Sequence, residues 1–381
     1  MHVTNQACVV STKTLRIAAM GDMMLARDVG RHFSTHPSDF AMPEIQELLS
    51  GHDVVLANLE NPVSYAGKPH PKQKPNVTFC ADPDTLKILS SLGIDTVSLG
   101  NNHLLDYGPE ALLETLAHLD KAGIRHSGAG RDYDEANCPV FIEKDGFRLA
   151  ILSCVFIYSA STEMARDGIP GVSEYRLRRI LPRIRELRAA GYIVIVSIHW
   201  GLEYSFYPVP YQMRQARQMI DSGASLVIGH GPHYVQGTER YRDGMIVYSL
   251  GNFIFDEPYR FSNRGYIFSA TLSPEGSLTN FATYPIRLVR HVPQLTTGSE
   301  RAQMMRRIEA LSRAYTRRNR SHWRGISSQY FSDIVNRVLT MRSLKFLALP
   351  PLRFYLEIGI VNTLKKIRLA NISSIFSLAK R

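Results

Sequence analysis

Residues 96–108, TVSLGNNHLLDYG, join a short apolar segment directly to a run of amide, imidazole and carboxylate side chains. The first part, TVSLG, is β-branched and apolar, which is typical of a strand buried on both faces. Asn101, Asn102 and His103 follow at once, with Asp106 just behind them. In α/β sheets, ligands bind beyond the carboxyl ends of the strands. The stretch therefore predicts a functional edge of a buried sheet.

Similar apolar runs recur along the chain and predict further buried strands. They cover residues 15–20, 54–58, 148–154, 192–198, 225–229 and 245–250. Helical patterns fall between the strands, at residues 43–49, 109–123, 175–191 (interrupted by Pro182) and 211–223. Strands that alternate with helices predict an α/β sheet. Residues 265–273 and 278–289, on either side of a Pro-Glu-Gly-Ser turn, predict an antiparallel hairpin.

Side chains that can bind metal follow most of these strands. They are Asp22, Glu60, Asn102, His103, His199, Glu203, His230, His233 and Asn252. Each has an ordinary explanation when taken alone: Gly-Asp after a strand is usually a turn or helix cap, and a lone histidine is usually a hydrogen-bonded structural residue. Glu203 and Asp106 are as readily explained as solvated surface charges.

Because side chains that can bind metal recur at six strand ends, a buried metal or catalytic site is favoured over these separate explanations. A dry cluster of such groups needs partners that offset the cost of desolvation. Mixed imidazole and carboxylate donors suit Mn, Fe or Zn, whereas Ca and Mg prefer oxygen ligands alone. The sequence therefore predicts a site for one or two divalent metal ions.

Charge is distributed unevenly along the chain. The net charge is +11, yet residues 301–381 hold 17 Lys and Arg against three acids, so residues 1–300 are close to neutral. Helical patterns with interleaved apolar residues continue through this segment, and Ile360, Leu364 and Ile367 share one helical face. Such a basic amphipathic segment either lies on an anionic membrane surface or packs its apolar face on the protein body. Nucleic-acid binding rests on charge alone and is the less favoured interpretation.

The cysteines and the N-terminus bear on location. Cys8, Cys80, Cys138 and Cys154 are scattered without a CxxC pair, which favours reduced thiols and, weakly, the cytosol. The N-terminal residues do not have the pattern of a signal peptide, and the chain has no run of about 20 apolar residues. The expected location is therefore cytoplasmic, with peripheral membrane attachment through residues 301–381 as an option.

Seven spaced motifs resemble those of one protein family. They are GDMMLAR (21–27), NLENPV (58–63), GNNHLLDYG (100–108), SGAG (127–130), HWGLEY (199–204), GHGPHYVQG (229–237) and YSLGNFIFD (248–256). Their order is similar to that in CapA/PgsA-like capsule and poly-γ-glutamate synthesis proteins, which in turn resemble calcineurin-like metallophosphoesterases. The resemblance spans about residues 15–257. It implies a four-layer α/β/β/α sandwich around a two-metal site.

The resemblance also implies roles for individual residues. Asp22 and Glu60 look like the first-metal and bridging carboxylates, Asn102 like the amide ligand, and His199, His230 and His233 like the imidazole ligands. His103 looks like the histidine that touches the phosphoryl oxygen or leaving group. Two positions depart from the phosphoesterase pattern: Met24 replaces a histidine ligand, and both Gly231 and Pro232 separate the last two histidines. CapA-like proteins share both departures.

These residues permit a metal-assisted hydrolysis. His103 is suited to act as general acid because its pKa is ordinarily near neutral, and Asp106 could orient its ring. Asn101, Glu203 and Asn252 are expected to contact substrate. Arg27 and Arg125 could bind an anion, but surface arginine is the more ordinary interpretation.

The sequence thus predicts a CapA-like metallophosphoesterase domain over residues 12–290 and a basic helical tail over 300–381. The expected activity is hydrolysis of a phosphoester, or of a related anionic ester or amide, in a small-molecule or polymer substrate linked to capsule or poly-γ-glutamate synthesis. The alternative is a metal-binding component of a polymer synthesis or export complex that carries out no hydrolysis. Met24 slightly favours this alternative, whereas the otherwise complete set of ligands favours an enzyme.

Overall fold

The computed structural model describes residues 13–157, 159–259 and 261–316. Its first sheet is built around the N-terminal strand and has the order β16-β15-β14-β1-β2-β3-β4, with β13 also paired to β1. These strands are β1 (Leu15–Met23), β2 (Val54–Leu59), β3 (Thr96–Ser98), β4 (Arg125–Ser127), β13 (Asn252–Ile254), β14 (Arg264–Leu272), β15 (Leu278–Val289) and β16 (Val292–Leu295). Strands β1 to β4 run parallel, whereas β14, β15 and β16 form the antiparallel part that contains the predicted hairpin.

The second sheet has the order β11-β12-β10-β9-β7-β6. Its strands are β6 (Val140–Lys144), β7 (Phe147–Val155), β9 (Ile193–His199), β10 (Ala224–His230), β11 (Thr238–Tyr241) and β12 (Gly244–Val247). Strands β7, β9, β10 and β12 are parallel, so their carboxyl ends meet at one edge. The short strands β5 (Ala129–Gly130) and β8 (Gly171–Val172) pair with each other.

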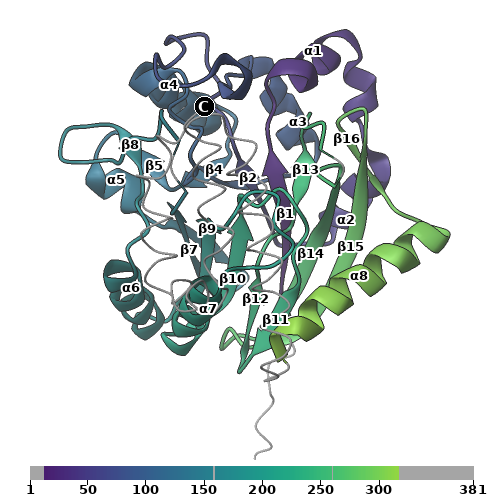
Figure 1. The fold of residues 1–381 in the computed structure, drawn as a ribbon. Helices are drawn as coiled ribbons and strands as arrows, with labels where there is room; N and C mark the ends of the chain where they lie inside the picture. Colours follow the sequence, from purple (N-terminus) through teal and green to yellow (C-terminus); the bar gives the residue numbers. More distant parts are fainter. Residues whose placement is uncertain (1–12, 158, 260, 317–381) are drawn as a thin grey trace, which may run out of the picture. The chain divides into compact units, whose positions relative to one another are not determined.

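The two sheets pack face to face, and helices cover their outer faces (Figure 1). Apolar side chains of both sheets form the core between them, including Ile17 and Leu56 from the first and Ile151 and Ile195 from the second. The helices α1 (Arg27–Thr35), α2 (Pro43–Ser50), α3 (Leu86–Ser91) and α4 (Gly108–Lys121) share a second apolar core with the outer face of the first sheet. On the other side, α6 (Leu177–Ala189) contacts β9, and α7 (Pro210–Asp221) contacts β10 and β12. The predicted four-layer α/β/β/α sandwich is confirmed.

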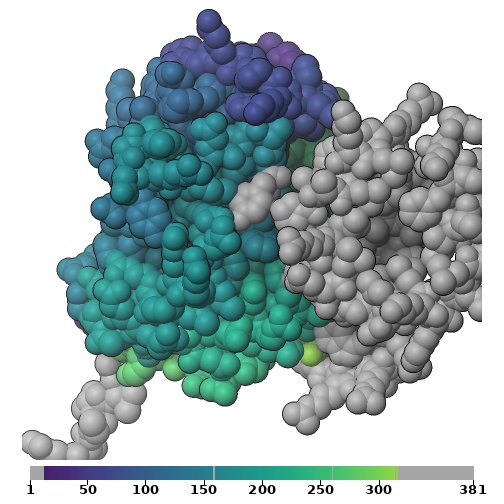
Figure 2. Space-filling model, turned by 60° about the vertical axis from the view of Figure 1, so that its left-hand side comes forward, coloured from purple at the N-terminus to yellow at the C-terminus, as the bar shows by residue number. Residues whose placement is uncertain are grey.

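In the space-filling view, side chains of the N-terminal part of the chain (purple to blue) lie directly against those of its middle part (teal) on one face (Figure 2). Helix α6 continues through Pro182, where the sequence had predicted an interruption. Pro182 removes only the hydrogen bond to the carbonyl of Arg178, near the start of the helix, and Ile180, Ile184 and Leu187 still bury one face.

Helix α8 (Gly298–Thr316) also belongs to the body. It buries Met304, Ile308, Leu311 and Tyr315 and contacts β11 and β15. The backbone N–H of Thr238 donates to the Ser312 hydroxyl at 2.9 Å. The described body therefore extends past residue 290. The remainder of the predicted basic tail, including Ile360, Leu364 and Ile367, lies outside the described residues.

Candidate metal centre

The site begins at the end of β1, where the backbones of β1 and β13 come very close. Asp22 pairs in register with Asn58 of β2 and with Asn252 of β13. Gly21 precedes it, and a Cβ at this position would lie 1.9 Å from the carbonyl oxygen of Gly251. Only glycine permits this approach, which lets the Asp22 N–H donate to that same carbonyl oxygen at 3.0 Å. The Asp22 carboxylate is thereby fixed at the sheet edge.

Three of the predicted ligands converge in a buried cluster. Asp22, Glu60 and His233 each offer a ligand atom, and these atoms lie within 4.8 Å of one another. His233 Nδ1 is 3.3 Å from Asp22 Oδ2, and His233 Nε2 is 3.5 Å from Glu60 Oε1. All three residues are at most 4% exposed. Such a spacing allows a single cation to contact all three side chains.

The second sheet contributes two more histidines to the same cluster. His199 ends β9 and His230 ends β10, and the two are partners in the parallel register, which places neighbouring backbones about 4.8 Å apart. His199 Nε2 lies 3.7 Å from Glu60 Oε1, and His230 Nδ1 lies 3.3 Å from Asp22 Oδ1. The centre is therefore assembled from the edges of both sheets.

Several buried polar atoms of the predicted ligands have no hydrogen-bond partner among the described residues. They are Glu60 Oε1, Asn102 Oδ1 and both ring nitrogens of His230. Buried polar groups are normally satisfied, and leaving one unpaired costs on the order of 1–3 kcal/mol. All four are atoms of the kinds that coordinate divalent metals such as Mn, Fe or Zn. The donor set therefore fits a cation with oxygen and imidazole ligands.

Protonation of the cluster follows from burial and from the neighbouring charges. Burial alone would raise the pKa of Asp22, but the neighbouring imidazoles of His230 and His233 outweigh it and hold that pKa well below its usual value. Burial lowers the pKa of His199 to about 3, so its imidazole is neutral, the form that binds metal.

Glu60 and His233 are shifted in the opposite direction. Burial raises the pKa of Glu60 well above its usual value, and the charges of Asp22, Glu257 and Glu203 add to this increase. Burial opposes the charge on His233, yet the carboxylates of Glu257, Glu60 and Asp22 outweigh it and raise the pKa of His233. Several acidic side chains thus lie in one buried space, and their negative potential attracts cations.

Outer hydrogen bonds orient His233. Its Nδ1 lies 2.9 Å from Asn252 Oδ1, which requires a proton on that nitrogen and leaves Nε2 facing Glu60 as the free ligand atom. The Asn252 amide in turn donates to Glu257 Oε2 at 3.2 Å, and the Tyr204 hydroxyl donates to Glu257 Oε1 at 2.6 Å. Asn252 was predicted to contact substrate, and that contact stays a prediction.

Two residues of the centre were not predicted. Asn58 Nδ2 donates to Asp22 Oδ1 at 2.9 Å and lies 3.4 Å from Glu60 Oε2, so it holds both carboxylates. Asn58 ends the apolar run 54–58 and therefore carried the same strand-end signal as Asp22. Glu257 follows β13 within an irregular segment and carried no such signal.

The predicted acid and its orienting carboxylate also lie together. His103 Nδ1 is 2.8 Å from Asp106 Oδ2, and the Phe79 N–H donates to the same oxygen at 2.9 Å. The Phe79 ring lies 4.4 Å from the His103 ring, and the Ser161 hydroxyl donates to Asp106 Oδ1. Asp106 is fully buried, so it is not the solvated surface charge of the alternative explanation.

Asn101 and Asn102 support the same loop. The Asn101 amide donates to the Leu59 carbonyl at 2.7 Å, and its own oxygen accepts from the His103 N–H at 3.1 Å. The backbone carbonyl of Asn102 accepts from the hydroxyls of Ser159 and Thr162. The predicted contact of Asn101 with substrate, like that of Glu203, stays a prediction. The Glu203 charge acts on the pKa of Glu60, and its side chain is partly exposed.

Met24, Arg27 and Arg125 each make contacts that are typical of structural residues. Met24 is fully buried in the apolar core beneath the helices, so the position that departs from the phosphoesterase pattern supplies no ligand. Arg27 forms an ion pair with Asp256 and lies 4.5 Å above the Phe79 ring. Arg125 pairs with Asp95 at 3.7 Å and is half exposed, as expected for surface arginine.

With this geometry in place, comparison with known proteins identifies the family. Residues 16–257 match the model of the bacterial capsule synthesis protein family PGA_cap, and the chain belongs to this family. The capsule biosynthesis protein CapA of Bacillus anthracis is 30% identical over 64% of this chain and 60% of that protein. The PGA biosynthesis protein CapA of Bacillus subtilis is 30% identical over 65% of each chain, so this chain spans less than two thirds of both relatives. A solved structure, the NAD nucleotidase of Haemophilus influenzae, is similar with a TM-score of 0.43 and 12% identity, over 84% of this chain and 60% of that chain.

Proposed function

We propose that this protein is a metal-dependent hydrolase that acts on a phosphoester, or on a related anionic ester or amide, in capsule or poly-γ-glutamate synthesis. The observation that carries the proposal is the buried convergence of Asp22, Glu60 and His233 with unpaired donor atoms of Glu60, Asn102 and His230. Family membership supports the link to capsule synthesis, and the four-layer sandwich agrees with the metallophosphoesterase resemblance.

The metal would be held by Asp22, Glu60, Asn102, His199, His230 and His233. A divalent ion in this position supplies Lewis-acid activation of the ester and of the attacking water. Glu60 would act as a ligand next to both His199 and His233, because its Oε1 lies near the Nε2 atom of each imidazole. The neutral Asn102 oxygen adds a ligand without adding negative charge.

His103 would hand a proton to the leaving group. The ion pair with Asp106 fixes Nδ1 and directs Nε2 away from Asp106, and packing against Phe79 restricts the ring. Its side chain is 10% exposed, so a substrate atom can approach it from solvent. Proton transfer by a positioned side chain of this kind contributes about 10²–10⁴-fold in rate.

A second candidate is a metal-binding component of a polymer synthesis or export complex. The burial of Met24 in the apolar core, which leaves one fewer ligand than the phosphoesterase pattern provides, favours it. In this alternative the centre would bind an anionic polymer without cleaving it.

Metal content measured together with turnover distinguishes the two candidates. The full-length protein would be stripped with a chelator, reloaded separately with Mn, Fe or Zn, and assayed with bis(p-nitrophenyl) phosphate and a γ-glutamyl amide. Turnover that rises with bound metal supports the hydrolase. Stoichiometric metal without turnover of either probe supports the component, and failure to bind any of the three metals contradicts both.

A further inference from the structure

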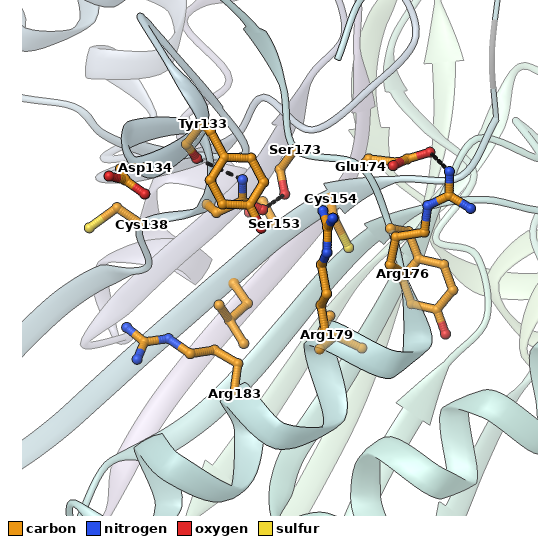
Figure 3. Close-up of a pocket in the computed structure, with 14 residues that line it drawn as sticks. Tyr133, Asp134, Cys138, Ser153, Cys154, Ser173, Glu174, Arg176, Arg179 and Arg183 are labelled. Carbon is orange, nitrogen blue, oxygen red and sulfur yellow. Dashed lines mark hydrogen bonds and ion pairs between the residues drawn. The ribbon is translucent and has the colours of Figure 1, made fainter. Parts of the chain in front are cut away.

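A second cavity lies on the outer face of the second sheet, away from the inter-sheet core. It has a volume of about 360 Å³ and is lined by residues of α5 (Tyr133–Asn137), β7, the segment after β8, and α6 (Figure 3). Side chains alternate along β7: Leu149 and Ile151 face the inter-sheet core, whereas Leu152 and Cys154 line the cavity. The volume lies in the range of small-molecule sites, about 300–1,000 Å³.

Three arginines line this cavity, one at the N-cap of α6 and two within the helix. Arg176, Arg179 and Arg183 recur at the spacing that places side chains on one face of a helix. Arg176 is paired with Glu174 at 2.5 Å, and Arg183 with Glu186 at 2.8 Å. The latter pair is exposed enough to contribute little stability, so Arg183 can exchange partners at low cost.

Arg179 is the central cation of the cavity. Its guanidinium lies 5.4 Å from the Tyr133 ring, and within the described residues it forms no ion pair with a carboxylate. Figure 3 shows it rising between Tyr133 and Cys154, while Arg183 reaches toward Cys138. Among the described residues that line the cavity, Asp134 is the only acid besides the paired Glu174.

Two serine hydroxyls of the wall already have hydrogen-bond partners. The Ser173 hydroxyl donates to Asn137 Oδ1 at 2.8 Å, and the Ser153 and Ser127 hydroxyls lie 2.7 Å apart. Leu152 and Ile180 add apolar surface. The groups available to a ligand are therefore the arginine guanidinium groups and the apolar surface of Leu152 and Ile180.

We propose that this cavity is a second binding site, which takes a small molecule bearing a carboxylate or phosphate. Arg179 and Arg183 hold the oxyanion through charge-assisted hydrogen bonds, and a compact apolar part rests on Leu152 and Ile180. The site is separate from the metal centre, because Cys154 is in register with Ile198, and His199 after it faces the other side of the sheet. It does not depend on the proposed hydrolysis.

Cys138 provides a direct readout because its exposed thiol lines the cavity. Full-length, metal-stripped protein would be alkylated with the anion iodoacetate or the neutral iodoacetamide, with and without millimolar inorganic phosphate, phenyl phosphate or glutarate. Mass spectrometry of the Cys138 peptide gives the rate, and Cys80 serves as an internal reference outside the cavity. We expect iodoacetate to be favoured at Cys138 and at least one oxyanion to protect it, and the protecting oxyanion shows whether phosphate or carboxylate is preferred.

A matched pair of variants tests the assignment. Arg178 is exposed, adjacent on the same helix and not part of the lining, so R178Q removes the same charge outside the cavity. R179Q should weaken protection about tenfold or more and abolish the preference for iodoacetate, whereas R178Q should leave both unchanged. Equal effects of the two variants, retained protection in R179Q, or no protection and no iodoacetate preference in the unmodified protein would each overturn the proposal.

Discussion

At the scale of single residues, His199 and His103 have different proposed roles, and their removal should have different effects. His199→Ala removes an imidazole from the buried cluster, and the protein should lose bound metal because a ligand is gone. His103→Ala should keep its metal and lose turnover by about 10²–10⁴-fold, because a general acid is missing. Metal content by plasma mass spectrometry, measured beside turnover, checks both. Equal loss of metal in the two variants would identify His103 as a ligand instead.

Glu257 offers a test of the outer hydrogen bonds. Glu257→Gln weakens the acceptor for the Asn252 amide and the Tyr204 hydroxyl, so the ring of His233 is less firmly oriented. We expect metal affinity to fall by about 10–100-fold, the usual cost of losing such support. Competition with a chelator of known affinity gives the value, and Glu143→Gln, on the exposed part of β6, is the control. Unchanged affinity would mean that Asn252 holds His233 without help from Glu257.

At the scale of elements, α8 should behave as part of the core. Leu311 lies on the buried face of this helix and is 5% exposed. Leu311→Ala should lower the free energy of unfolding by about 2–5 kcal/mol. Urea unfolding measures the change. Arg301→Ala, on the exposed side of the same helix, should stay within about 0.5 kcal/mol. A small effect of Leu311→Ala would show that α8 contributes little to the stability of the sheets.

The sequence predicted elements well where burial leaves a continuous apolar run. Strands β1, β2, β7, β9 and β10 were found within a few residues of their bounds for this reason. Strand β4 was missed because Arg125 and His126 are polar and the strand is held by backbone pairing with β3. Helix α8 was expected in the tail. Its apolar spacing predicts a buried helical face, but the spacing does not show which surface covers that face.

In the metal centre, too, the sequence predicted most of the residues at strand ends and missed one that a loop positions. Asp22, Glu60, His199 and His230 lie at strand ends and His233 lies three residues beyond β10, so their convergence could be predicted from the ends of the strands. Glu257 is hydrogen-bonded to Asn252 and Tyr204, and such a link depends on loop geometry that no periodicity encodes.

At the scale of the whole molecule, charge divides the chain just beyond α8. Residues 1–316 hold 32 acidic and 32 basic side chains, whereas residues 317–381 hold 13 Lys and Arg against two acids. Among the residues that the structure describes, no helix combines the length and apolar character needed to cross a bilayer.

We propose that residues 317–381 bind anionic membrane surfaces, where each basic residue near the lipid contributes roughly 1 kcal/mol. The full-length protein should sediment with anionic vesicles at low salt and be released by high salt, whereas a chain ending at Thr316 should stay in solution. The truncation belongs after α8, because a cut at residue 300 would remove the buried Leu311 and Tyr315. Neutral vesicles are the control, and absence of binding by the full-length chain would favour packing of this segment on the body.

The position of β1 in the middle of the first sheet has a consequence for synthesis on the ribosome. This strand is synthesised before the other described strands of its sheet, and two of its neighbours, β13 and β14, lie beyond residue 251. Until those neighbours are made, the nascent chain carries an open, apolar strand edge, which is a hazard for pairing with other chains. Asp22 must likewise wait for Gly231, 209 positions later, before its surroundings exist. The proposed metal binding thus requires a chain synthesised at least as far as His233, and a ribosome that stalls before β14 leaves a product that cannot close this edge of its first sheet.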